Sequence, residues 1–61
     1  MGPIAITKEI DLVHYPGEEE RPGCWYFQGY GRLRDRISQE FPTEEEAMKA
    51  YREGRLQFEN A

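Results

Sequence analysis

Two residue types that could serve nucleophilic catalysis occur once each in the chain, as Cys24 and His14. A cysteine nucleophile needs a base such as histidine within hydrogen-bond reach. Here an acidic segment rich in proline and glycine, residues 16–23, separates the two. Because free cysteine usually behaves as a small apolar residue, we expect Cys24 to be a strand residue and His14 an exposed residue at a strand end. We therefore predict no catalytic residues and no enzyme activity.

Metal binding is disfavoured by the same scarcity, because a structural zinc site takes four ligands and the chain has one Cys and one His. The run Glu18–Glu20 lacks the alternating ligands and turn glycine of an EF-hand, so we interpret it as a solvated charge run. Glycines at 29 and 31 are not followed by the Lys and Ser/Thr of a phosphate loop. We predict no metal, no cofactor and no small-molecule substrate.

One group of side chains favours binding. The run Cys24–Tyr30 is rich in β-forming residues and places Trp25 and Phe27 on one side of a strand, with alternate residues on the other. Arginines follow at every second position. Rings and guanidinium groups on paired strands can stack on bases, clamp phosphates or form a protein interface, or simply pack together and shield an open sheet face. The predicted binding residues are Tyr26, Gln28, Tyr30, Arg32, Arg34 and Arg36.

The hydrophobic pattern predicts three strands. Aliphatic residues at positions 4, 6, 10 and 12 indicate a half-buried strand over about residues 4–13. A mobile loop is expected over 16–23, followed by a strand over 24–30, a glycine turn and a strand over 33–41. In that last strand Leu33, Ile37 and Phe41 should face the core, whereas Arg34, Arg36, Ser38 and Glu40 should point away.

A helix is predicted over about residues 44–54. Thr43 can cap its start and Glu46 can complete a capping box, while Gly54 suits its end. Small residues at 47 and 50 allow the helix to lie close to a sheet. Leu56 and Phe58 should fold back over an open edge of the core.

These elements predict one α+β domain over residues 1–61, with a three-stranded antiparallel sheet (a meander) and one C-terminal helix packed on one face. The expected core consists of Ile6, Ile10, Trp25, Phe27, Ile37 and Phe41. A domain of about 60 residues buries a limited core. A homodimer or a partner protein would therefore add stability.

Charge and cysteine content narrow the class of partner. The net charge of −4, taken over the whole chain, disfavours nucleic acid and anionic membranes as partners. Residues 21–41, however, carry four arginines against Asp35 and Glu40. No secretory signal or membrane-spanning stretch is evident. A single cysteine cannot form an internal disulfide, which favours a cytoplasmic protein.

Residues 24–51 combine an aromatic strand, a glycine turn, an arginine-rich segment and the stretch FPTEEEA at 41–47. This combination resembles small strand–strand–helix modules of phage and bacterial proteins, such as the N-terminal arm-binding domains of tyrosine-type integrases, which often enter their helix through a similar F-x-T-x-x-E-A stretch. In that family the sheet enters the major groove of DNA. The resemblance implies base or phosphate contacts by Arg32, Arg34 and Arg36, supported by Tyr26 and Tyr30.

Three functional hypotheses follow. The first is a non-enzymatic interaction module, an accessory protein of a phage or bacterium that binds a protein partner. The second is a nucleic-acid-binding module that uses the same Tyr and Arg side chains. The third is an acidic nucleic-acid mimic that inhibits a DNA-binding protein through Glu18–Glu20 and Glu44–Glu46.

Overall fold

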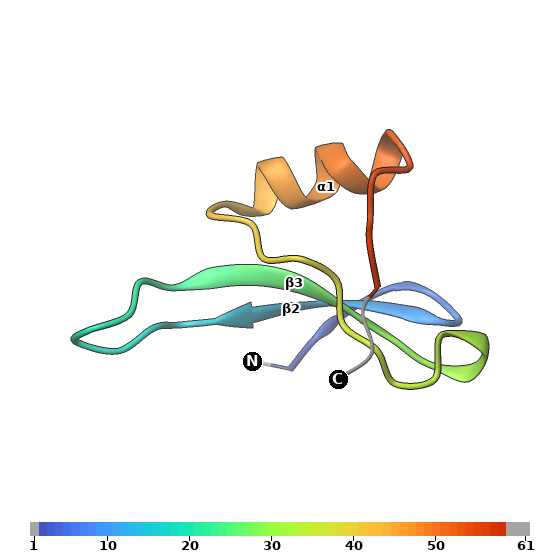
Figure 1. The fold of residues 1–61 in the computed structure, drawn as a ribbon, viewed down its shortest axis with the longest axis horizontal. Coiled ribbons are helices and arrows are strands. Elements are labelled where there is room, and N and C mark those ends of the chain that lie inside the picture. Colours follow the sequence, from blue (N-terminus) through green and yellow to red (C-terminus); the bar gives the residue numbers. More distant parts are fainter. Residues whose placement is uncertain (1, 59–61) are drawn as a thin grey trace.

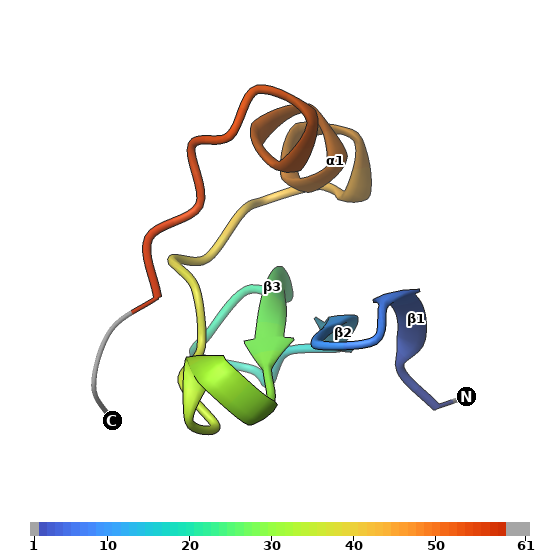
Figure 2. The ribbon, with the colours of Figure 1, turned by 90° about the vertical axis from the view of Figure 1, so that its right-hand side faces the viewer.

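The computed structural model describes residues 2–58 and contains three strands and two helices. Antiparallel strands form a sheet in the order β1-β2-β3, and the α-helix crosses one face of it above β3 (Figures 1 and 2). The predicted α+β meander with one helix on one face is thus confirmed. The elements are β1 (Ile4–Thr7), β2 (Ile10–Tyr15), β3 (Cys24–Gly29), a 3-10 helix η1 (Gly31–Leu33) and α1 (Glu44–Arg52).

No helix among residues 2–58 combines the length and apolar character that crossing a membrane requires.

The prediction of a single strand over residues 4–13 is wrong, because the chain reverses at Lys8 and Glu9 and forms two paired strands. The hydroxyl oxygen of Thr7 accepts a hydrogen bond from the Glu9 backbone N–H at 3.1 Å, which closes the turn. A hydroxyl bonded to the backbone two residues on is a turn device that needs no glycine or proline. β1 also has a bulge just before this turn, between Ala5 and Thr7.

Residues 16–23 connect β2 to β3 and carry an inner turn. The backbones of Glu18 and Arg21 exchange two hydrogen bonds of 2.8 and 3.1 Å, so the three glutamates project from the end of the hairpin. Gly17 has a φ of 90°, and a Cβ there would lie 2.6 Å from the backbone nitrogen of Gly23. Only glycine fits this close approach of the two hairpin arms.

The strand predicted over residues 33–41 is also wrong as a regular strand. Residues 31–33 form η1, and Arg34 and Asp35 then adopt left-handed conformations with φ of 52° and 58°. Only residues 36–41 run along β3, where two isolated bridges join Gln28 to Ile37 and Trp25 to Phe41. Between those bridges the outer segment has one residue more than β3, which makes a bulge.

The bulge reverses the predicted orientation of two side chains. Ser38, expected to point outward, is only 4% exposed, and its Oγ accepts a hydrogen bond from the Phe27 backbone N–H at 2.9 Å. Ile37, expected in the core, is 40% exposed. The serine hydroxyl takes the place of a backbone carbonyl that the bulge displaces, so the buried N–H stays satisfied.

The helix begins as predicted and ends two residues early. The Oγ1 of Thr43 accepts a hydrogen bond from the backbone N–H of Glu46 at 3.1 Å, which confirms the cap. The last helical residue is Arg52, and Gly54 follows with a φ of 69°. Ala47 and Ala50 are fully buried. Their small side chains let α1 approach β3 closely.

Phe27 forms the centre of the core, where it is fully buried between the sheet and α1. Its ring stacks on Tyr51 with centroids 5.8 Å apart and meets Phe41 edge-on at 6.3 Å. The predicted return of Leu56 and Phe58 onto the core is confirmed. The Gln39 amide holds this tail with two hydrogen bonds, one to the Arg55 carbonyl at 3.0 Å and one from the Gln57 backbone N–H at 2.9 Å.

Candidate functional site

The side of the sheet turned away from α1 carries Tyr26 and Gln28, as predicted. Leu12 pairs with Phe27 in the core, so the neighbouring pairs, Val13 with Tyr26 and Asp11 with Gln28, must point to the opposite side. All four residues are half-buried. We call this side the outer face and define it by Asp11, Val13, Tyr26, Gln28, Tyr30 and Ile37.

Tyr30 extends the outer face beyond the end of β3. Its backbone N–H donates to the Glu9 carbonyl at 2.8 Å, and its side chain is 39% exposed. Burial raises the pKa of the Tyr30 phenol, and the neighbouring carboxylate of Asp11 raises it further. A protonated phenol at the rim of the outer face is a hydrogen-bond donor for a bound partner.

Ile37 belongs to this face because it bridges to Gln28. The Gln28 side-chain amide donates to the Gly29 carbonyl at 3.0 Å and to the Arg36 carbonyl at 3.4 Å, and these bonds fix its position at the end of the strand. An exposed isoleucine therefore lies next to tyrosines and a fixed amide. Residues of this mixture are common in the centres of protein interfaces.

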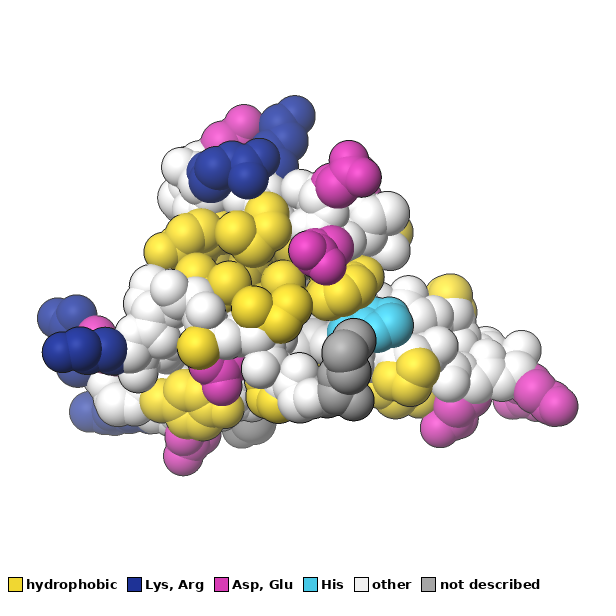
Figure 3. All heavy atoms as spheres, turned by 180° about the vertical axis from the view of Figure 1, so that it is seen from behind, with side chains coloured by type: hydrophobic (Ala, Val, Ile, Leu, Met, Phe, Trp, Pro, Cys, Tyr) yellow, Lys and Arg dark blue, Asp and Glu magenta, His cyan; other side chains and the backbone are white. Residues whose placement is uncertain are grey.

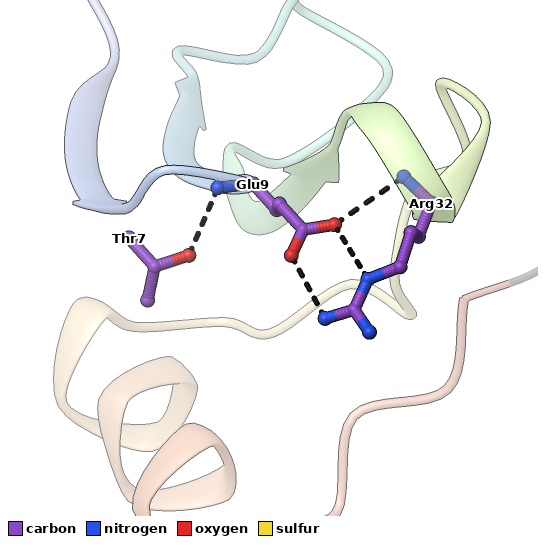
Figure 4. A network of polar contacts seen from close by, with 3 residues as sticks. All are labelled: Thr7, Glu9 and Arg32. Atoms are coloured by element: carbon purple, nitrogen blue, oxygen red, sulfur yellow. Dashed lines mark hydrogen bonds and ion pairs between the residues drawn. The ribbon is translucent and has the colours of Figure 1, made fainter.

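Arg32, a predicted site residue, is bound to Glu9 of the β1–β2 turn and is not part of the outer face. Its Nε and Nη2 donate to the two carboxylate oxygens of Glu9 at 3.2 and 3.0 Å, and its backbone N–H lies 3.3 Å from Oε2 (Figure 4). These hydrogen bonds lower the pKa of the Glu9 carboxyl below its ordinary value. The pair fastens the β1–β2 turn to η1, and the neighbouring carboxylate offsets the positive charge of Arg32.

The predicted row of Arg34 and Arg36 beside the tyrosines is not formed, because the chain there is not a strand. Arg34 is exposed in a left-handed turn at the end of the molecule. Arg36 is half-buried, and its Nε is buried without a hydrogen-bond partner among residues 2–58. The structure therefore brings Tyr26, Gln28 and Tyr30 together without a row of arginine side chains beside them. Arg36 meets Gln28 only through its backbone carbonyl, which accepts from the Gln28 amide at 3.4 Å.

Sequence reasoning missed Asp11, Val13 and Ile37 on this face. Asp11 and Val13 alternate with Leu12 in β2, so their placement follows from the pattern once β2 is known to pair with β3. Ile37 reaches the face only because of the bulge, and no local signal in the sequence marks the bulge.

At the hairpin end of the outer face, Cys24 lies under charged side chains. Cys24 is 8% exposed, and close by the Arg21 guanidinium contacts Glu40 at 2.7 Å and lies 5.3 Å above the Tyr15 ring. Burial raises the pKa of the Cys24 thiol, and the carboxylate of Glu40 raises it further. A thiol held in its protonated form is a poor nucleophile.

His14 lies on the other side of the sheet from Cys24. It pairs with Trp25, and the two rings stack with centroids 4.3 Å apart. Neighbouring strand positions alternate between faces, so His14 on the helix side cannot reach the thiol on the outer face. No cysteine–histidine pair is assembled. Among residues 2–58, no three His, Cys, Asp or Glu side chains gather in a way that would hold a metal ion.

No protein family, curated protein or solved structure matches the chain. The resemblance of residues 24–51 to integrase arm-binding domains therefore stays a prediction, and so does the assignment of DNA contacts that it implies.

The reactivity of the Cys24 thiol tests whether it is buried and protonated in the folded protein. We expect iodoacetamide at mildly alkaline pH to modify Cys24 at least about tenfold more slowly in the folded protein than in urea, because burial and the raised pKa both suppress the thiolate. Mass spectrometry of timed samples measures both rates. Equal rates in the two states would contradict the buried, protonated thiol.

Proposed function

We propose that the protein is a non-enzymatic interaction module that binds a protein partner through the outer face of its sheet. The observation that carries the proposal is the one-sided cover of the sheet. The helix and the C-terminal tail bury the side that holds Phe27, while the outer face keeps Tyr26, Tyr30 and Ile37 at the surface. Exposed apolar and aromatic groups gathered on a rigid sheet are typical of binding surfaces.

Charge favours a protein over a nucleic acid as the partner. Asp11 lies within the outer face beside Tyr30, and a carboxylate there opposes a phosphate backbone. Arg32 is already paired with Glu9. Tyrosine and isoleucine beside the carboxylates of Asp11 and Asp35 suit a protein surface that offers an apolar centre and a hydrogen-bond donor.

The proposal also covers the cellular location and the source of the protein. We propose a cytoplasmic accessory protein, because its one thiol is buried and has no second cysteine to pair with. The resemblance of residues 24–51 favours a phage or bacterial source.

The test compares how well the wild-type protein and variants of its outer face bind a partner protein. We expect the pair Tyr26→Ala and Ile37→Ala, checked for folding by circular dichroism, to lose at least about tenfold in affinity for a partner that the wild-type protein retains from a lysate of its host cells. The matched control is Arg34→Ala with Glu19→Gln, which alters two exposed side chains away from the outer face and should retain the partner.

A partner that the outer-face variant retains as well as wild type does would exclude the outer face. Binding to duplex DNA at low salt that Arg34→Ala weakens would instead favour the nucleic-acid hypothesis.

A further inference from the structure

The sheet has one open edge among the described residues. β3 is flanked on its far side by residues 36–41, which bond to it through the Trp25, Phe27 and Gly29 backbones. Within residues 2–58, β1 pairs with β2 alone and no strand lies on its other side. An unpaired strand edge is a template for pairing with another chain.

The alternation of hydrogen bonds determines which residue of β1 faces outward. The bond from Tyr30 N–H to the Glu9 carbonyl shows that Glu9, and hence every second residue of β2, bonds toward β3. Leu12 therefore bonds toward β1, where its partner is Ile4. It follows that the N–H and C=O of Ala5 point to the open edge.

Apolar surface accompanies this edge. Ile4 is 47% exposed, and beside it lies a groove of about 450 Å³ whose lining includes Pro3, Leu12, His14 and Trp25. Figure 3, viewed from the β1 side, shows hydrophobic side chains filling the space between the helix and the sheet next to the histidine. The hydrophobic core is thus covered less completely on the β1 side.

Charge is separated along the strands. The turn before β2 and residues 31–36 after β3, here called the basic end, carry an excess of positive charge even though Glu9 pairs with Arg32. The charged residues there are Lys8, Arg32, Arg34 and Arg36 against Glu9 and Asp35. The opposite end of the same strands leads to the acidic tip Glu18–Glu20, where all three side chains are exposed. Figure 3 shows basic side chains gathered at one end of the sheet, with some acidic side chains near them, and acidic side chains without basic ones at the other end.

We propose that a second copy of this chain pairs with the β1 edge about a two-fold axis at Ala5. The two Ala5 residues would exchange N–H···O=C bonds, and Ile4 of each copy would lie opposite Ile6 of the other, on the helix side of the joined sheet. A two-fold axis reverses the strand direction, so the basic end of each copy lies toward the acidic tip of its partner. Charge complementarity therefore selects the second copy as the occupant of this edge.

The dimer uses the β1 edge and leaves the outer face of both copies free, so it is independent of the proposed partner binding.

Sedimentation equilibrium up to about 1 mM protein tests the proposal. The mass of the wild-type protein should rise from 7.2 kDa toward twice that value, and it should rise less at high salt because salt screens the charged ends. Ala5→Pro should remain at the monomer mass. Proline is tolerated on an edge strand whose N–H faces solvent, so the monomer should keep its fold by circular dichroism.

Charge exchange supplies a second variant set that keeps the edge intact. Lys8→Glu or Glu19→Lys alone should raise the dissociation constant by about twofold at low salt, and the two together should restore it because the facing ends of the two copies again carry opposite charges.

Three results would overturn the proposal. These are a single 7.2 kDa species at every concentration, an Ala5→Pro variant that dimerises as well as wild type, and loss of the dimer in the outer-face pair Tyr26→Ala and Ile37→Ala. Capture of a partner by the Ala5→Pro variant tests the outer face separately, because that variant leaves the outer face unchanged.

Discussion

Replacement of Phe27 by alanine is expected to cost about 3–5 kcal/mol of unfolding free energy, the range for a large aromatic side chain removed from a packed core. Phe27 is fully buried between β2, α1 and the aromatic rings of Phe41 and Tyr51. A domain this small has about 3–5 kcal/mol from its core, so the variant should be largely unfolded in buffer. Urea titrations followed by circular dichroism and Trp25 fluorescence measure the change.

Tyr30→Ala is the matched control, because it removes a ring of similar size from a position that is 39% exposed. It should lower the free energy of unfolding by much less than Phe27→Ala does. A Phe27→Ala variant with a wild-type midpoint would show that the core is not built around this ring.

The pattern at the start of the chain fits a strand and a hairpin equally well. The hairpin reverses at Lys8 and pairs Ile4 with Leu12, so the aliphatic residues at even positions share a face in both arrangements. Apolar residues at every second position therefore identify the buried side of the segment but do not show where the chain turns. The turn itself depends on the Thr7 hydroxyl, a signal much weaker than a glycine or proline.

The end of the sheet could not be predicted for a different reason. Arg34 and Asp35 take left-handed conformations that residues other than glycine seldom adopt. The bulge then places Ile37 and Phe41 on opposite sides although their spacing would put them on the same side of a regular strand. Both features come from how the segment fits along β3, which local sequence does not encode.

The residues of the candidate site also fall into those that the sequence could place and those that it could not. Tyr26 and Gln28 could be placed because burial of Phe27 fixes the pleat of β3. The arginine row could not, since it required a regular strand after η1. The partner of Arg32 is Glu9, 23 residues earlier, and only the folded chain shows that pairing.

Three sides of the small sheet have different surroundings: the helix side, the outer face and the β1 edge. The helix covers the core side. We propose that the outer face binds a partner and that the β1 edge pairs with a second copy. Because the dimer would leave both outer faces exposed, it would present two equivalent binding surfaces and raise avidity for a partner with repeated sites.

Ser38→Ala should cost about 1–3 kcal/mol of unfolding free energy, because it leaves the buried Phe27 N–H without an acceptor at the bulge. Thr7→Ala removes a similar hydroxyl acceptor from the exposed Glu9 N–H, where water can replace it, so it should cost less. Urea titrations give both free energies, and faster hydrogen exchange at the Phe27 amide should accompany the Ser38 change. If Ser38→Ala changed stability by less than about 0.5 kcal/mol, the hydroxyl would not be what satisfies the bulge.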